Sequence, residues 1–119
     1  MPPQSKRQAA ERRGKRAEWL AALFLMFKGY RIIQHRFKTK SGEIDLIARK
    51  GDLVIMVEVK ARRTVQEAAD SVSYSAQRRI NNAADIWLGK QADATQLSIR
   101  FDIIAICPRK WPAHLEDAF

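Results

Sequence analysis

The chain has 119 residues, one cysteine and a formal net charge of +9 at pH 7. Its length suits a single domain with one hydrophobic core, and the lone Cys107 excludes both an intramolecular disulfide framework and a cysteine-ligated zinc site. The excess of positive charge favours a polyanionic partner, nucleic acid above all, over a mere gain in solubility.

The first predicted element is a helix over about residues 4–28, a stretch rich in Ala, Arg, Glu, Lys and Leu that ends at Gly29. We expect one domain over residues 1–119, in which the basic residues 1–10 are open to disorder. The apolar run 19–27 is far shorter than the roughly 20 residues of a membrane-spanning helix, and no small-residue cleavage site follows it. The sequence therefore predicts a cytoplasmic protein with no membrane partner.

Three strands are predicted next. The stretch YRIIQHRF, residues 30–37, is aromatic and β-branched and is followed by turn residues. The stretch GEIDLIARKGDLVIMVEVKARR, residues 42–63, contains two strands joined by a tight turn at Gly51 and Asp52. Because the loops between these three strands are short, the strands should form an antiparallel meander.

The second half of the chain predicts a helix and a fourth strand. Apolar residues recur at helical spacing over about residues 72–88, and Gly89 ends the run. The β-branched run 97–106 stops at Pro108. A helical crossover implies that the fourth strand pairs in parallel with the third. The predicted fold class is α/β with a mixed sheet, in the order helix, strand, strand, strand, helix, strand.

The turn at Gly51 fixes which residues of the hairpin face each other. A two-residue loop with glycine first suits a type II′ turn, and this register sets Asp45 opposite Glu58 and Glu43 opposite Lys60. A slip by one residue would mix polar and apolar side chains on both faces. In the predicted register the other face is wholly apolar and carries Ile44, Leu46, Ala48, Leu53, Ile55, Val57 and Val59.

Asp45 and Glu58 are thereby predicted to be like charges on facing strands, about 4.5–5.5 Å apart at Cβ. Lys60 is the one cation on that face, and it also faces Glu43, with which an ordinary ion pair is the structural alternative. The shortage of positive charge favours a hard divalent ion, Mg²⁺ (or Mn²⁺), which binds carboxylate and carbonyl oxygens. We therefore predict Asp45, Glu58 and the main-chain carbonyl of Val59 as metal ligands.

The stretches GEIDLIA, VEVKAR and IRFDIIAI, after a helix reading AEWLAALFLMFKGYRI, resemble the YraN family of small bacterial proteins. These are relatives of the archaeal Holliday-junction resolvases within the PD-(D/E)XK nuclease superfamily, and the likeness covers about residues 14–106. It implies a restriction-endonuclease-like fold and a metal-dependent endonuclease that hydrolyses phosphodiester bonds, with branched DNA as a candidate substrate. It also implies a homodimer, since resolvase relatives act as two-fold dimers.

The resemblance assigns residue roles by motif. Asp45, Glu58 and Lys60 correspond to the acids and the lysine that bind the metal and assist the water. Glu18 is the counterpart of the glutamate that resolvase-like members add from the first helix. Arginine and lysine side chains near these motifs are expected to hold flanking phosphates, with DNA favoured over RNA; they are Arg36, Lys38, Arg62, Arg63, Arg78 and Arg79.

The chain departs from the family pattern at three positions. Ala17 stands where glycine is usual, Arg36 where asparagine is usual, and Ala76 where a lysine is usual near the start of the second helix. These departures leave two alternatives open, a nucleic-acid-binding module that keeps the fold without cutting and a protein-interaction subunit. His35 and His114 lack the spacing of a zinc or histidine-nuclease site and are expected to be structural or solvent-facing.

Overall fold

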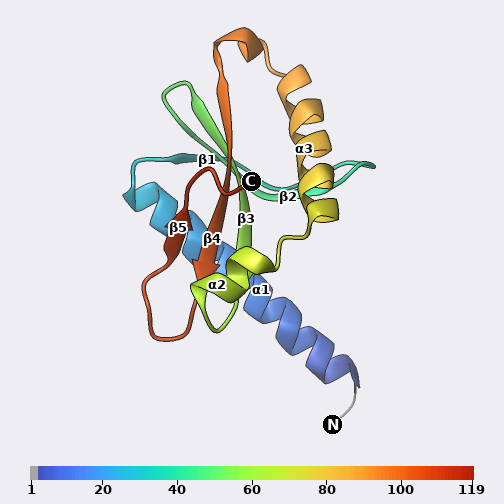
Figure 1. Cartoon of the computed structure of the whole chain (residues 1–119), viewed down its shortest axis with the longest axis vertical. Helices are drawn as coiled ribbons and strands as arrows, with labels where there is room; N and C mark the ends of the chain where they lie inside the picture. Colours follow the sequence, from blue (N-terminus) through green and yellow to red (C-terminus); the bar gives the residue numbers. More distant parts are fainter. Residues whose placement is uncertain (1–2) are drawn as a thin grey trace.

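The computed structural model of the protein describes residues 3–119, and the side chains of residues 6–119 (Figure 1). Its elements along the chain are α1 (Pro3–Phe27), β1 (Arg31–Lys38), β2 (Glu43–Lys50), β3 (Leu53–Ala61), α2 (Val65–Asp70), α3 (Tyr74–Gly89), a 3-10 turn (Ala94–Gln96), β4 (Ser98–Ile106) and β5 (Ala113–Leu115).

The first helix agrees closely with its prediction. It ends at Phe27, so that only Lys28 separates it from Gly29. It begins at Pro3 and therefore includes most of residues 1–10, the basic segment expected to be open to disorder. Residues 1 and 2 lie outside the described part of the chain. None of the helices that the structure describes is long and apolar enough to cross a bilayer.

The sheet has five strands in the order β1-β2-β3-β4-β5. The first three form the predicted antiparallel meander, and β4 runs parallel to β3 after the helical crossover. This confirms the mixed α/β sheet and is consistent with a nuclease-like fold. Three short elements were not predicted: the six-residue helix α2, the 3-10 turn Ala94–Gln96, and the three-residue strand β5, which pairs antiparallel with β4.

Helices cover both faces of the sheet. Ala21, Ala22 and Leu25 of α1 pack on one face against Leu46, Ala48, Ile55, Val57 and Ile104. Ile80, Ala83, Ala84 and Trp87 of α3 pack on the other face against Ile47, Val54, Met56 and Ile103. Because β3 is covered on both sides, Glu58 near its end is held in the interior.

The hairpin register follows the turn as predicted. Lys50 pairs with Leu53 and Leu46 with Val57, and Gly51 has a φ of 62°, as the first position of a type II′ turn requires. One face assignment was wrong, since Ile44 packs on the α3 side with Ile47 and not on the α1 side with Leu46. The reason is that regular pairing with β3 stops at Leu46, so the alternation of sides does not continue to the start of β2.

A fully buried carboxylate, Asp102 of β4, ties the C-terminal residues to the sheet. Asp102 accepts hydrogen bonds from the guanidinium of Arg100 (2.9 and 2.8 Å), from His114 Nε2 (2.7 Å) and from the main-chain amide of Asp117 (3.0 Å). Lys28, directly after α1, in turn donates to His114 Nδ1 (2.6 Å). His114 is therefore structural, as expected, and joins α1, β4 and β5.

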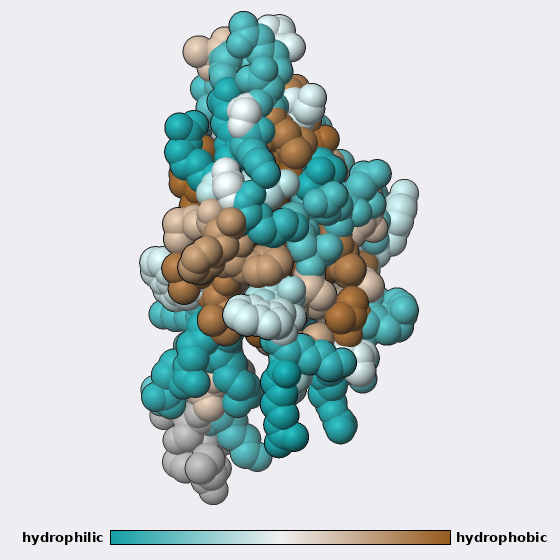
Figure 2. Space-filling model, turned by 90° about the vertical axis from the view of Figure 1, so that its left-hand side faces the viewer, coloured by the Kyte–Doolittle hydropathy of each residue, from teal (hydrophilic) through white to brown (hydrophobic). Residues whose placement is uncertain are grey.

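Apolar side chains also gather on the surface, over the face that Figure 2 turns to the viewer. A groove there lies between α1 and the segment that joins β4 to β5; it is lined by Leu20, Leu23, Phe24, Phe27, Ile106, Cys107, Trp111 and Pro112, with Arg109 and Lys110 at its rim. Trp111 is 89% exposed. This groove is separate from the pocket described next.

Candidate active site

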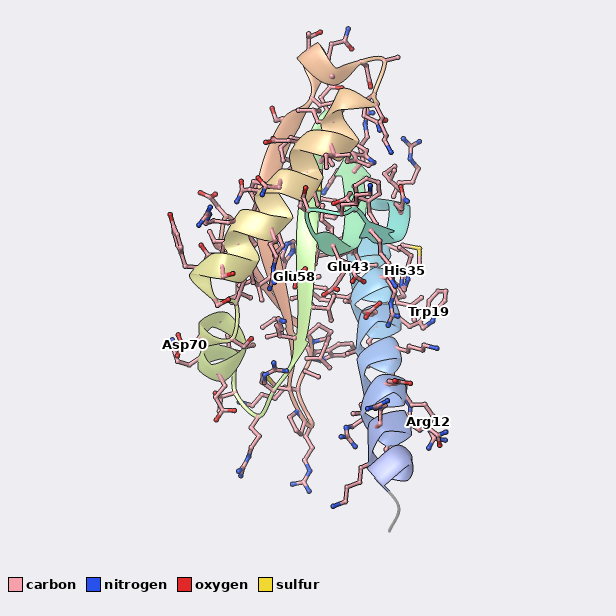
Figure 3. The ribbon with its side chains drawn as sticks, turned by 90° about the vertical axis from the view of Figure 1, so that its right-hand side faces the viewer. Arg12, Trp19, His35, Glu43, Glu58 and Asp70 are labelled. Carbon is pink, nitrogen blue, oxygen red and sulfur yellow. The ribbon has the colours of Figure 1, made fainter. Side chains whose placement is uncertain are left out.

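A pocket of about 400 Å³ opens at the end of β3 where β2 moves away from it. It is lined by Gly42, Glu43, Glu58, Lys60, Ala76, Arg79 and Ile80, so that β2, β3 and α3 each contribute. Figure 3 shows Glu58 and Glu43 between α3 on one side and α1 on the other. The pocket therefore brings together Glu43, Glu58 and Lys60 of the predicted set, whereas Asp45 is not among the residues that line it.

Close packing and a helix cap fix the α3 wall of this pocket. The Ser73 hydroxyl accepts a hydrogen bond from the amide of Ala76 (3.1 Å), which sets where α3 begins. At Gly42 a Cβ atom would overlap the main-chain carbonyl of Arg79, so only glycine allows the β1–β2 turn to approach α3 this closely. Ala76 faces the pocket, and the family's usual lysine at this position is therefore a charge that this site lacks.

Asp45 bridges the gap between the separating strands. Its Oδ2 accepts a hydrogen bond from the amide of Val59 at 2.9 Å, and so replaces the main-chain partner that β2 no longer supplies. Burial raises the pKa of Asp45 to about 6, the Val59 hydrogen bond opposes that rise, and the negative charge of Glu18 adds to it. The hydrogen bond thus holds the Asp45 side chain beside Val59, the residue that follows Glu58 in β3.

Glu58 is 8% exposed, and its environment disfavours a negative charge. The pKa of Glu58 is raised to about 8, and burial is the main cause. The negative charge of Asp45 contributes to this rise, and the positive charge of Lys60 opposes it. Lys60 Nζ lies 3.8 Å from Glu58 Oε2. The expected ion pair of Lys60 with Glu43 was wrong, because Lys60 turns to the more buried carboxylate while Glu43 stays exposed.

Glu18 lies close to this pair but is already engaged. The Arg36 guanidinium donates through Nε and Nη2 to the two carboxylate oxygens of Glu18, at 2.9 and 3.1 Å. Arg36 has a φ of 54°, in the left-handed region where asparagine is more readily accommodated than most residues. The structure thus places Glu18 near Asp45, as the resemblance implied, with an arginine bound to both of its oxygens.

The donor set fits a magnesium ion held largely by water and substrate. Among the described residues, no three His, Cys, Asp or Glu side chains gather closely enough to hold a metal by themselves. Mg²⁺, however, is usually bound by one or two carboxylates, with waters and phosphate oxygens completing its octahedron. Asp45 and Glu58 are two such carboxylates, and each has a pKa that a nearby cation would lower.

The basic residues predicted to hold phosphates fall into separate groups. Arg79 lines the pocket and Arg36 binds Glu18. Arg62 and Arg63 line a second groove with Arg13 and Arg16 of α1. Lys38 and Arg78 are exposed and are not among the residues that line the pocket.

Two features of the structure were not found from the sequence. Trp19, next to Glu18, stacks on His35 with ring centroids 5.3 Å apart, and Asp102 carries no functional prediction although it is completely buried. An acid inside the β-branched run LSIRFDIIAI was the available signal for Asp102. For Trp19 there was none, because the stack depends on β1 passing beside α1.

Comparison with known proteins gives one consistent result. The profile of the uncharacterised protein family UPF0102 matches residues 17–106. A UPF0102 protein of Chelativorans sp. is 60% identical over 113 residues, which are 95% of this chain and 91% of that protein. A UPF0102 protein of Mesorhizobium japonicum is 58% identical over 117 residues, 98% of this chain and 94% of the relative, and one of Agrobacterium fabrum is 54% identical over 115 residues, 97% and 94%.

Proposed function

This chain belongs to the UPF0102 (YraN) family, and we propose that it is a nucleic-acid-binding protein and a metal-dependent endonuclease that hydrolyses phosphodiester bonds in DNA. The single observation that carries the proposal is the buried Glu58, which is influenced by the charges of Asp45 and Lys60 at the point where β2 and β3 separate. Burial raises the pKa of both carboxylates, and Asp45 raises that of Glu58 further. Such a group, with one lysine beside it, is costly for a fold and suited to a divalent cation.

Each residue of the site has a role in this chemistry. Asp45 and Glu58 would hold Mg²⁺ or Mn²⁺, with the carbonyl of Val59 as a further oxygen donor; the bound ion polarises the scissile phosphate and lowers the pKa of a water molecule. Lys60 sits 3.8 Å from Glu58 and can orient the attacking water and stabilise negative charge on the phosphate. Asp45 is kept in register for this by the Val59 amide.

The substrate is bound mainly through its phosphates. With a net charge of +9, the protein has the electrostatic footprint of a nucleic-acid binder, and Arg79 is placed to contact a phosphate beside the carboxylates. We propose DNA, branched DNA included, as the substrate, with little preference for base sequence. A two-fold dimer, if formed, would present two such pockets to one DNA molecule.

A second candidate function follows from the engagement of Glu18. Because Arg36 binds both oxygens of Glu18, the third acid is neutralised by an arginine and not by a metal. A module that binds nucleic acid without cutting it would have this arrangement. The missing charge at Ala76 favours the same alternative.

Cleavage of a labelled four-way DNA junction with and without Mg²⁺ tests the proposal. We expect the native protein to cut only with the metal, and the Glu58→Gln variant to bind the junction but leave it intact. The matched control is Asp85→Asn, which removes an exposed acid of α3 outside the pocket and should cut normally. Binding without cleavage by the native protein would support the binding module in place of the enzyme.

A further inference from the structure

Trp19 of α1, the residue that follows Glu18, presents an aromatic ring to solvent. Trp19 is 62% exposed, whereas Trp87 of α3 is packed in the core and is 4% exposed. Burying an indole ring is strongly favourable, so a tryptophan left on the surface gives up that gain. Its position is set by α1, because the neighbouring residues Ala17 and Glu18 face inward.

One face of the indole is supported by the protein. The rings of Trp19 and His35 are stacked, with their planes 29° apart. His35 is itself held close to the carboxylate of Glu18, with Nδ1 3.9 Å from Oε1, and its Nε2 is buried without a hydrogen-bond partner among the described residues. The stack is therefore an ordered two-ring structure that leads from the surface to Glu18, and Glu18 acts electrostatically on Asp45.

We infer that Trp19, backed by His35, is a binding site for an unpaired nucleobase of the substrate. The inference rests on the proposed function and adds a substrate class to it. Flat nucleobases stack on aromatic side chains whatever their identity, and a ring with one face supported and the other turned to solvent offers such a surface. A base within a duplex already has neighbours on both faces, so the base bound here must be unstacked.

Basic side chains continue from Trp19 along the same side of α1. Residues three, four and seven positions apart share one face of a helix, and Arg16, Lys15 and Arg12 stand at these distances before Trp19, all exposed. Lys15 and Arg12 lie roughly 6 and 10 Å along the helix axis from Trp19. Figure 3 shows Arg12 and Trp19 on the same side of α1. Phosphates of a strand whose base rests on Trp19 would meet these charges.

The arrangement selects a substrate with unpaired bases close to the bond to be cut. Single strands, flaps and the open centres of branched DNA have such bases, and a continuous duplex does not. Trp19 would thus favour binding of the former, while Arg79 and the basic residues of α1 bind phosphates of either.

Equilibrium binding to a short oligothymidylate and to a blunt duplex of the same length tests the inference. We expect Trp19→Ala to weaken binding of the oligothymidylate about fivefold or more, the scale of one base–aromatic stack, and to leave duplex binding unchanged. Trp19→Phe should recover most of the loss, because it restores a ring. The matched control is Trp111→Ala, which removes the other exposed tryptophan, far from the pocket, and should change neither affinity.

A second readout is independent of affinity. Stacking of a base quenches indole fluorescence, so oligothymidylate should quench the native protein and Trp111→Phe, and should quench Trp19→Phe much less. If Trp19→Ala lost affinity equally for oligothymidylate and for the duplex, or if Trp19→Ala and Trp111→Ala changed affinity equally, the inference would be overturned. The proposed function would still stand. Failure of the native protein to bind either probe would overturn both.

Discussion

Arg36 binds both carboxylate oxygens of Glu18, at 2.9 and 3.1 Å, from a backbone conformation with a φ of 54°. The arginine thus occupies the side of Glu18 from which a cation would approach. Burial and hydrogen bonding make this pair firm, since the Glu18 side chain is 10% exposed and a bidentate arginine bond is among the stronger polar contacts in proteins. Whether Glu18 joins the metal site depends on this contact.

Replacing Arg36 with asparagine should release Glu18. Without metal, the variant should lose about 1–3 kcal/mol of stability, because a buried carboxylate is left without its partner. Added Mg²⁺ should then stabilise Arg36→Asn more than the native protein, since three acids attract the ion more strongly than two. Thermal unfolding with and without Mg²⁺ measures both effects. Arg31→Asn, on the exposed start of β1, is the control, and an equal Mg²⁺ effect in the two variants would remove Glu18 from the metal site.

The stability of the metal-free protein should fall as pH rises. The folded pKa of Glu58, about 8, is above its ordinary value of 4.5, so the folded state keeps a proton that the unfolded state has lost. Stability therefore decreases from near pH 4.5 to near pH 8 and levels off above it. Glu58→Gln should flatten this slope and be about 1–3 kcal/mol more stable than the native protein at the upper end. Urea unfolding across this range checks the prediction. Asp45, with a pKa of about 6, adds to the slope below that pH, so a slope that persists in the variant between pH 6 and pH 8 would mean that Glu58 is not its source.

Gly42 should tolerate no side chain. A Cβ atom there would meet the main-chain carbonyl of Arg79, and neither backbone can move without shifting α3 or the β1–β2 turn. Gly42→Ala should cost about 1–3 kcal/mol. Gly14→Ala is the opposite case, because Gly14 lies in α1 with open space around its Cβ position, and the change should stabilise by up to about 1 kcal/mol. Chemical denaturation of both variants distinguishes close packing from a general effect of glycine replacement.

Among the acidic residues that the structure describes, Asp102 is the one whose substitution should lower stability most. Burial alone would raise its pKa, but the hydrogen bonds from His114, Arg100 and Asp117 hold the pKa at about 2, below the ordinary value of 3.8. The contribution of the Asp102 carboxylate to the free energy of unfolding is present above pH 3.8 and is lost as pH falls toward 2. Asp102→Asn should cost about 3–5 kcal/mol at neutral pH, since it leaves Arg100 without its charged partner. A loss below 1 kcal/mol in urea unfolding would contradict this account.

Two adjacent arginines of α3 offer a matched test of phosphate binding. Arg79 lines the pocket and Arg78 does not, yet each substitution by glutamine removes one charge. Arg79→Gln should weaken DNA binding more than Arg78→Gln. It should also reduce the slope of log K against log salt by about 0.9, the contribution of one phosphate contact on duplex DNA. Fluorescence anisotropy at several salt concentrations measures both, and identical slopes for the two variants would exclude Arg79 from contact with phosphate.

The sheet was largely predictable because its determinants are local. Gly51 selected the turn, and the turn set Lys50 against Leu53 and Leu46 against Val57, where regular pairing ends. Asp45 contacts β3 through its side chain, which accepts a hydrogen bond from the Val59 amide. Ile44 was misplaced because it lies beyond Leu46, where regular pairing with β3 ends. The alternation of side chains along a strand predicts which face of the sheet a residue occupies only over the part of the strand that is regularly paired.

The partners of the site residues were harder to predict because they come from distant segments. Glu18 meets Arg36 only because β1 passes beside α1, and Lys60 chooses Glu58 over Glu43 according to burial. No pattern in either segment encodes those choices. Strand β5 was missed for a different reason, since its three residues, AHL, are too few to show alternation.

The short strand β5 has a consequence for how the chain behaves in solution. It pairs with Ile103, Ile104 and Ala105, and the amide of Ala118 then bonds to the carbonyl of Phe101, so the outer side of β4 is covered by the last residues of the chain. Unpaired strand edges invite pairing with other molecules and promote aggregation. A protein shortened by residues 113–119 would expose the edge of β4 and would also leave the buried Asp102 without His114 and the Asp117 amide, so we expect it to aggregate and to unfold more readily.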